Sequence, residues 1–270
     1  MALYCLPLWP TFSSQIQIRL QLSHFLLIFE GIQLETLMKR TVNIPVMVCL
    51  SFLAAACAPK EPVKYLALSF DDGPNLTTES KMLDVLEKHN VPATFFVIGN
   101  NITDESSESM RRAIKQGCEI GNHSFSHPVM SQLDEGQVRE EVETTSALIE
   151  KVTGKRPKFF RPPYINVKSE MYDWIDLTFI CGKGCQDWEA SVGKEARLEG
   201  IISSAEPGAI YLLHDFEGNE ATVEALDEAI PVLKEQGYVF VTVSELFEKL
   251  KCTPDGHTMY TVVPDGRSNH

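Results

Sequence analysis

Apolar, strand-like runs alternate with amphipathic, helix-like segments from residue 65 onward, and this alternation most constrains the fold. The strand-like runs cover residues 65–70, 93–99, 118–124, 158–164, 176–182, 208–215 and 238–247. The helix-like segments between them cover residues 77–90, 105–117, 134–154, 194–205 and 220–236. Strands that alternate with helices in this way form parallel sheets. The sequence therefore predicts a single α/β domain, and its length fits a barrel with fewer than eight strands.

The residues before the first strand have a different character. Residues 38–57, MKRTVNIPVMVCLSFLAAAC, combine a Lys-Arg pair, an apolar run, small alanines and a final cysteine. This order is typical of a bacterial lipoprotein signal peptide that ends at Cys57. We therefore expect an exported lipoprotein, anchored in the membrane by a lipid on Cys57 and facing the periplasm or cell surface. The alternative is a transmembrane anchor, for which the apolar run is short.

The remaining boundaries follow from this interpretation. Residues 1–37 are read as an upstream extension that does not belong to the protein, and residues 58–63 as a tether. The folded domain is expected over residues 64–250. Residues 251–270 form a C-terminal tail, either frayed or folded as a small hairpin.

Four cysteines lie beyond the predicted signal peptide: Cys118, Cys181, Cys185 and Cys252. Cys181 and Cys185 are the nearest couple along the chain. In an oxidising compartment they could form a disulfide, and the alternative is a pair of free thiols.

The formal net charge of −13 bears on the partners. A strongly acidic chain is repelled by nucleic acid and by anionic lipid surfaces. We therefore expect no nucleic-acid partner and no membrane contact other than the lipid anchor. We also expect a monomeric protein.

Chemically useful side chains follow several of the predicted strands. Asp71 and Asp72 end the first run, and His123, Arg161 and His214 occupy similar positions later in the chain. In parallel barrels the C-terminal strand ends meet at one face and form the active site. These residues are therefore expected to lie close together although they are far apart in sequence.

Asp72, His123 and His127 are candidate metal ligands. The two histidines stand four residues apart in HSFSH, a spacing that is a weak signal by itself. A carboxylate from another strand strengthens it, because two imidazoles and one carboxylate leave a coordination position open for water. Asp71 is then free to act as a general base, with Gly73-Pro74 turning the chain so that both carboxylates face one cavity.

Arg161, Tyr164 and His214 complete the candidate site. A guanidinium beside Asp71 would keep that carboxylate ionised and oriented. The backbone N–H of Tyr164, which follows two rigid prolines, could donate to an oxyanion. His214 is the candidate general acid. Arg161 and His214 each have a simpler structural interpretation, as a surface arginine and as a buried or strand-end histidine.

Five ordered motifs together resemble those of the polysaccharide deacetylase family, also called the NodB homology domain or carbohydrate esterase family 4. They are SFDDGP (69–74), HSFSH (123–127), RPPY (161–164), QDW (186–188) and LLHD (212–215). The resemblance extends from about residue 64 to 249. It implies a distorted (β/α) barrel with about seven parallel strands.

The resemblance also implies roles for individual residues. By this likeness Asp71 is the catalytic base, Arg161 orients it, and His214 is the general acid. Asp72, His123 and His127 hold one divalent metal ion, commonly zinc, although cobalt or nickel would suit the same ligands. Tyr164 supplies the oxyanion contact and Trp188 the aromatic wall of the sugar site.

The implied reaction is hydrolysis of an acetyl group on a carbohydrate, most often the N-acetyl group of an amino sugar in peptidoglycan or a chitin-like chain. One position departs from the family pattern, because Gly184 stands where many members carry an aspartate that tunes the acid histidine. Asp187 is a candidate substitute. The surrounding sequence is also similar to acetylxylan esterases, so O-acetyl ester hydrolysis on a xylan-like polysaccharide is an alternative. A third hypothesis is a glycan-binding lipoprotein without catalysis.

Overall fold

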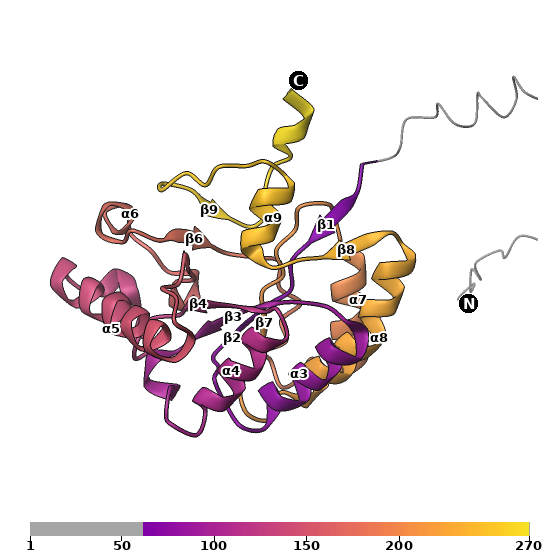
Figure 1. Ribbon diagram of the computed structural model, residues 1–270, viewed down its shortest axis with the longest axis horizontal. Helices are drawn as coiled ribbons and strands as arrows, with labels where there is room; N and C mark the ends of the chain where they lie inside the picture. Colours follow the sequence, from indigo (N-terminus) through magenta and orange to yellow (C-terminus); the bar gives the residue numbers. More distant parts are fainter. Residues whose placement is uncertain (1–61, 270) are drawn as a thin grey trace, which may run out of the picture. The chain divides into compact units, whose positions relative to one another are not determined.

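Seven short parallel strands form the central sheet of the computed structural model, which describes residues 62–269 (Figure 1). In spatial order these are β7 (Leu213–His214), β2 (Ser69–Asp71), β3 (Thr94–Val97), β4 (Glu119–Asn122), β5 (Phe159–Phe160), β6 (Thr178–Ile180) and β9 (Met259–Tyr260). β1 (Lys64–Leu66) and β8 (Tyr238–Phe240) form a separate parallel pair. The predicted run 65–70 is therefore divided between β1 and β2.

The segment around Tyr211 closes this sheet into a ring. On one side, the Tyr211 N–H donates to the carbonyl of Ala67 at 2.8 Å. On the other side, the Lys183 N–H donates to Ile210 and the Leu212 N–H donates to Lys183, at 2.8 and 2.9 Å. Hydrogen bonding therefore runs from the residues just before β2 to the residues just after β6 through this segment. The predicted distorted (β/α) barrel is confirmed.

Helices surround the strands on the outside (Figure 1). The long ones are α3 (Thr78–His89), α4 (Ser107–Lys115), α5 (Glu135–Thr153), α7 (Lys194–Ser203) and α8 (Glu220–Glu235). Each matches a segment predicted from the sequence to within a few residues. Shorter elements are α6 (Met171–Trp174), α9 (Val243–Lys249), η2 (Gly99–Asn101), η3 (Met130–Gln132), η4 (Pro163–Ile165) and η5 (Gly266–Asn269).

Two predictions near the C-terminus were wrong. The run 238–247 is a strand only over β8, and α9 begins at Val243. The Thr242 side chain accepts from the Glu245 N–H while the Glu245 side chain accepts from the Thr242 N–H, and this capping box starts the helix. The tail is neither frayed nor a hairpin, because β9 pairs with β6 in parallel and completes the sheet.

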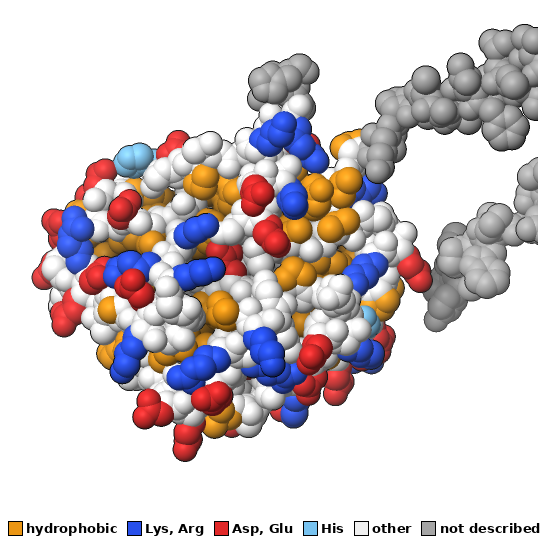
Figure 2. All heavy atoms as spheres, viewed as in Figure 1, with side chains coloured by type: hydrophobic (Ala, Val, Ile, Leu, Met, Phe, Trp, Pro, Cys, Tyr) orange, Lys and Arg blue, Asp and Glu red, His pale blue; other side chains and the backbone are white. Residues whose placement is uncertain are grey.

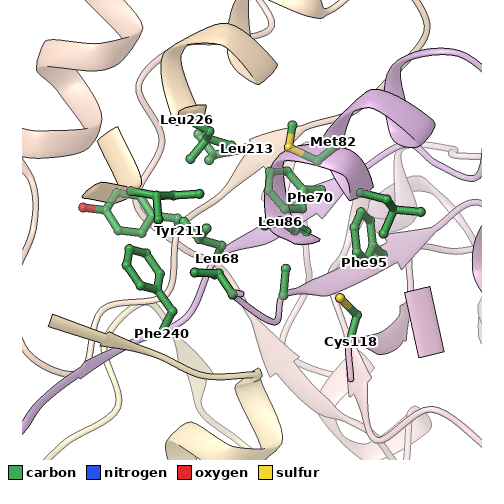
Figure 3. Packing of buried hydrophobic residues seen from close by; sticks show 14 of the residues in the cluster. Leu68, Phe70, Met82, Leu86, Phe95, Cys118, Tyr211, Leu213, Leu226 and Phe240 are labelled. Carbon is green, nitrogen blue, oxygen red and sulfur yellow. The ribbon is translucent and has the colours of Figure 1, made fainter. Parts of the chain in front are cut away.

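A buried apolar cluster fixes the strands against the outer helices (Figure 3). Phe70 of β2 and Phe95 of β3 lie with ring centroids 5.2 Å apart. Met82 and Leu86 of α3 pack against them, and all four side chains are at most 1% exposed. This packing holds the end of β2, and with it Asp71, in one position. On the outside, Figure 2 shows acidic and basic side chains interspersed, with apolar ones between them.

The described residues bear on two further expectations, the cysteine pairing and the membrane anchor. Cys118, Cys181, Cys185 and Cys252 are all free thiols, so the disulfide alternative is not supported. Within residues 62–269, no helix is both long and apolar enough to cross a bilayer. The upstream extension, the signal peptide ending at Cys57 and nearly all of the tether lie outside the described residues.

Candidate active site

The C-terminal ends of the strands bring the predicted site residues together. Asp71 ends β2 and lies in register with His214 of β7, while His123 follows β4 and Arg161 follows β5. Most predicted residues line one cavity of about 410 Å³: Asp71, Asp72, His123, His127, Tyr164, Trp188 and His214. Arg161 and Asp187 lie behind its wall, and both are fully buried.

Asp72, His123 and His127 form a compact group of possible metal ligands. The Oδ1 atom of Asp72 lies 3.5 Å from Nε2 of each histidine, and the ligand atoms of the three residues are all within 4.8 Å of one another. This Oδ1 atom is buried and has no hydrogen-bond partner in the described part of the chain. A buried carboxylate oxygen without a donor is costly, and a cation would compensate it.

The backbone around Asp72 is shaped to present its carboxylate. Asp72 has a left-handed φ of 79°, which is uncommon for a residue other than glycine. The Asn101 side chain donates to the Asp72 carbonyl at 2.9 Å, and the Ile98 N–H donates to the Gly73 carbonyl at 2.8 Å. These bonds hold a turn in which Asp71 and Asp72 face the same cavity.

The ring of His123 has a fixed tautomer. Its Nδ1–H donates to the carbonyl of Arg161 at 2.6 Å, which leaves the Nε2 lone pair directed toward Asp72. A ligating histidine in proteins is usually oriented in this way by a second hydrogen bond.

His127 lies on a turn rather than on a helix, with left-handed φ values at Ser124 and His127 of 66° and 57°. Glu141 of α5 holds this turn, because its carboxylate accepts from the N–H groups of Phe125 and Ser126 at 2.8 Å each. Burial and repulsion from His123 keep the pKa of His127 below its ordinary value, despite the attraction of Asp72. A neutral imidazole is the form that binds a metal.

These three residues fit a divalent metal ion. They supply one oxygen and two nitrogen donors on one side of an open cavity, the ligand set of many hydrolytic metal centres. When bound, such a cation lowers the pKa of a coordinated water and polarises a carbonyl oxygen.

Asp71 is held by a buried arginine, and its other carboxylate oxygen, Oδ2, lies 3.8 Å from Nε2 of His123. The Arg161 Nη1–H donates to Asp71 Oδ1 at 2.6 Å, and the two side chains are 0% and 3% exposed. Burial alone would raise the pKa of Asp71. Attraction to Arg161 and to the neighbouring histidines outweighs burial, so the pKa lies below its ordinary value. Asp71 is therefore an ionised carboxylate that can accept a proton.

Arg161 is itself fixed by contacts that the sequence did not indicate. Its Nη2 group donates to Ser69 Oγ at 2.7 Å and to the Cys181 carbonyl at 2.5 Å. Its guanidinium also lies 4.2 Å above the ring of Phe96. The serine two residues before Asp71 could have been recognised from strand alternation, because both side chains then face the barrel interior.

Asp187 is the partner of His214. Its Oδ1 atom accepts from the His214 Nδ1–H at 2.9 Å, and its Oδ2 atom accepts from the His214 backbone N–H at 2.7 Å. Burial alone would lower the pKa of His214, but this hydrogen bond and attraction to Asp71 raise it above the ordinary value. Asp187, the candidate substitute for a carboxylate at position 184, therefore lies in hydrogen-bond contact with His214.

Gly184 instead makes room for the aromatic rim. A Cβ at this position would lie 3.2 Å from Cζ3 of Trp188. Trp188 is 47% exposed and its ring meets that of His214 edge-on at 5.5 Å, while Tyr164 is 67% exposed across the cavity. Two exposed aromatic side chains at one opening suit the apolar faces of sugar rings. Apolar lining from Pro162, Ile165 and Leu212 was not predicted.

Two buried acids, which the sequence did not single out, lie behind the Asp72–Gly73 turn. A Cβ built on Gly73 would lie 3.2 Å from Asp215 Oδ2 and 3.4 Å from Glu79 Oε2, so both carboxylates flank this glycine. Both side chains are fully buried. Burial raises the pKa of Glu79 to about 7, and burial with repulsion from Glu79 raises the pKa of Asp215 well above its ordinary value.

Comparison with known proteins adds independent information. Residues 58–175 match the family model described as Polysaccharide deacetylase. The chain is 48% identical over 192 residues to the bifunctional xylanase/deacetylase of Pseudobutyrivibrio xylanivorans, covering 71% of this chain and 32% of the relative. It is 34% identical to the peptidoglycan-N-acetylglucosamine deacetylase of Bacillus cereus, covering 69% of each. The chain thus spans about a third of the first relative and two thirds of the second.

A solved structure agrees with the fold, and that structure contains a metal ion. The family 4 acetyl xylan esterase from Clostridium thermocellum, in complex with a cobalt ion, superposes with a TM-score of 0.72 at 41% sequence identity. The match covers 74% of this chain and 100% of that one.

Proposed function

Because this chain belongs to the polysaccharide deacetylase family, we propose that it is a metal-dependent hydrolase that removes acetyl groups from a carbohydrate. The observation that carries the proposal is the presence of two hydrogen-bonded pairs at one cavity, on the adjacent strand ends of β2 and β7. Asp71 with Arg161 forms a fixed base beside the ligand group, and His214 with Asp187 forms a fixed acid. Acyl transfer by water needs both functions on the two sides of one carbonyl.

Each side chain has a distinct role in the proposed proton transfers. Asp71 accepts a proton from the attacking water, and Arg161 keeps the carboxylate ionised and oriented during this transfer. His214 carries a proton on Nε2 and donates it to the leaving nitrogen or oxygen of the sugar. Asp187 holds the opposite ring nitrogen, Nδ1, so that Nε2 faces the cavity.

Asp72, His123 and His127 would hold the divalent cation, and zinc is the ion we propose. A mixed nitrogen and oxygen ligand set suits zinc, while cobalt and nickel have similar preferences. The backbone N–H of Tyr164 would donate to the oxyanion. Its residue lines the cavity, and a left-handed φ of 58° shapes the chain there.

The acetyl linkage is the finer part of the proposal. An amine is a poor leaving group, and the intact His214–Asp187 pair provides the acid assistance that N-acetyl hydrolysis requires. We therefore propose N-acetyl groups of amino sugars, as in peptidoglycan or chitin-like chains. Hydrolysis of O-acetyl esters on xylan is the second candidate. The similarity to a xylanase/deacetylase and to an acetyl xylan esterase favours it.

Acetate release from three substrates tests both candidates. Purified protein would be incubated with chitooligosaccharide, peptidoglycan and acetylated xylan, before and after treatment with a chelator and again after zinc is restored. Acetate from the first two supports the amide proposal, and acetate from xylan alone supports the ester. Release that survives both metal removal and Asp71→Asn would contradict the mechanism. No release from any substrate would favour a glycan-binding protein without catalysis.

A further inference from the structure

Arg197 is a buried cation whose guanidinium has no acid beside it. It lies on α7, is 4% exposed, and has no carboxylate within ion-pair distance among residues 62–269. A charge in such a position is costly unless other polar groups compensate it. Arg197 donates to four oxygen atoms instead, two of them on the side chains of Asn219 and Thr222.

These two side chains connect Arg197 to Asp187. The Arg197 Nη1 group donates to Asn219 Oδ1 at 2.5 Å and to Thr222 Oγ1 at 2.8 Å. The Thr222 hydroxyl lies 3.1 Å from Asp187 Oδ2, and Asn219 Nδ2 lies 3.4 Å from the same oxygen. Asp187 in turn bonds His214, so Thr222, Asn219 and Asp187 link the α7 guanidinium to the candidate acid.

The Arg197 guanidinium determines which group donates and which accepts in each hydrogen bond between Arg197 and Asp187. A guanidinium only donates, so Thr222 Oγ1 accepts from Arg197 and its single hydrogen is left for Asp187. In the same way Asn219 Oδ1 faces Arg197, which turns its amide hydrogens toward the His214 carbonyl and Asp187. Oδ2 of Asp187 thereby receives donors from Thr222, Asn219 and the His214 backbone. Its other oxygen remains for the His214 ring.

We propose that Arg197 is a positioning residue that acts through Thr222 and Asn219 to fix the Asp187 carboxylate and, through it, the Nδ1–H tautomer of His214. The proposal rests on the function proposed above for His214 as the proton donor. It explains why a buried arginine bonds two neutral side chains that in turn bond a fully buried aspartate. It also explains how acid support is maintained in a chain with glycine at position 184.

A purely structural role is the competing explanation, because Arg197 also donates to the carbonyls of Val192 and Glu189 and so ties a loop to α7. The two roles differ in which reactions they affect. A misplaced acid slows the loss of a poor leaving group, such as a sugar amine or alkoxide, but hardly affects 4-nitrophenolate, which needs no proton. A damaged site slows both.

The test uses Arg197→Met and Thr222→Val, with Thr222→Ser as the conservative variant that keeps the hydroxyl. Tyr211→Phe is the matched control. It removes a buried hydrogen bond, 2.6 Å long, from the Tyr211 hydroxyl to the Ile201 carbonyl on the same helix. This bond does not involve the relay, by which we mean the hydrogen-bonded residues Arg197, Thr222, Asn219, Asp187 and His214. For each variant, kcat is measured on the acetylated carbohydrate that the wild type hydrolyses and on 4-nitrophenyl acetate.

We expect Arg197→Met and Thr222→Val to lower kcat on carbohydrate by about tenfold or more. This loss is smaller than the roughly 10²–10⁴-fold decrease in kcat expected when a general acid is removed. Activity on 4-nitrophenyl acetate stays within about twofold. Thr222→Ser and Tyr211→Phe retain both activities. Equal losses on both substrates, or no loss on carbohydrate, would overturn the proposal, and Thr222→Val decides the question if Arg197→Met does not fold.

The imidazole ¹⁵N chemical shifts of His214 provide a readout that needs no substrate. They are assigned by comparison with His214→Ala and recorded at alkaline pH, where the ring is neutral. We expect the Nδ1–H tautomer in the wild type and a mixture of tautomers in Thr222→Val. An unchanged tautomer would overturn the proposal. If the wild type releases no acetate from any carbohydrate, the proposed function fails, while these spectra still decide whether the relay orients His214.

Discussion

Replacing Arg161 with methionine tests how the candidate base is kept ionised. Methionine is unbranched and close in length, so the substitution removes the charge without leaving a large cavity. The Asp71 carboxylate, which is 2% exposed, then loses the guanidinium that lies 2.6 Å away in the wild type. Removing one partner of a buried ion pair costs about 3–5 kcal/mol of folding free energy. We expect a loss of this size at neutral pH and above.

The sign of the pH dependence follows from Asp71. In the wild type its pKa is lowered, so its ionisation stabilises the fold above the unfolded-state pKa, and this contribution is lost as pH falls through the folded-state pKa. In Arg161→Met, burial would dominate and raise the pKa, so stability would instead fall as pH rises. The stability gap between the two proteins should therefore widen from acidic to alkaline pH, by about 1.4 kcal/mol for each pKa unit that separates them.

Urea unfolding at pH 4.5 and pH 8, with metal removed by a chelator, measures this gap. His123 and His214 remain near Asp71 in both proteins, so the difference isolates Arg161. The control is the double variant Asp71→Asn/Arg161→Met, which contains neither charge. We expect it to be more stable than Arg161→Met at pH 8 and to show no widening of the gap. A loss that is equal at both pH values, or a double variant as unstable as the single one, would refute this reasoning.

Three further predictions follow from the site. Asp72→Ala should lose a bound divalent cation, whereas Asp71→Asn should keep the cation and lose about 10²–10⁴ in kcat. Metal content after dialysis measures the first effect, and equal loss of metal in both variants would contradict the assigned roles. Glu79→Gln should stabilise the fold at pH 8 by up to about 3 kcal/mol and change it little at pH 4.5. The reason is that a pKa raised from 4.5 to about 7 makes the fold lose stability as pH rises through this range. Urea titrations check this, and an equal effect at both pH values would show that Glu79 is not strained by ionisation. Trp188→Ala should raise KM for the polysaccharide by roughly tenfold, about 1.4 kcal/mol of lost ring contact, with 4-nitrophenyl acetate hydrolysis unchanged. An unaltered KM would exclude Trp188 from the sugar site.

The sequence predicted the barrel because its long helices and apolar strands have strong periodicity. It failed where local and tertiary signals compete. Residues 241–247, VTVSELF, are rich in β-branched and apolar side chains, yet the Thr242–Glu245 capping box turns them into α9. The strand β9 has two residues and is defined only by its pairing with β6, which no local pattern reveals.

The same distinction applies to the site. The strand-end residues could be found because each follows an apolar run in a position where polar groups are unusual. The residues that support them, such as Arg197, could not be found from the sequence. Arg197, a helical arginine, is typical of a solvent-facing position until α7 packs on α8 and buries it. Glu79 lies in the first turn of α3, where acids usually stabilise the helix dipole, and only the tertiary fold encloses it.

The closure of the ring through the Tyr211 segment has a consequence for the order in which function is acquired. Asp72, His123 and His127 lie within the first third of the described chain, whereas His214 is brought opposite Asp71 only when β7 pairs with β2. Contacts over so long a stretch of chain are the slowest to form during folding. All candidate metal ligands thus come from one continuous stretch of chain, whereas the complete candidate site, with its acid, depends on the late-sequence strand that closes the barrel.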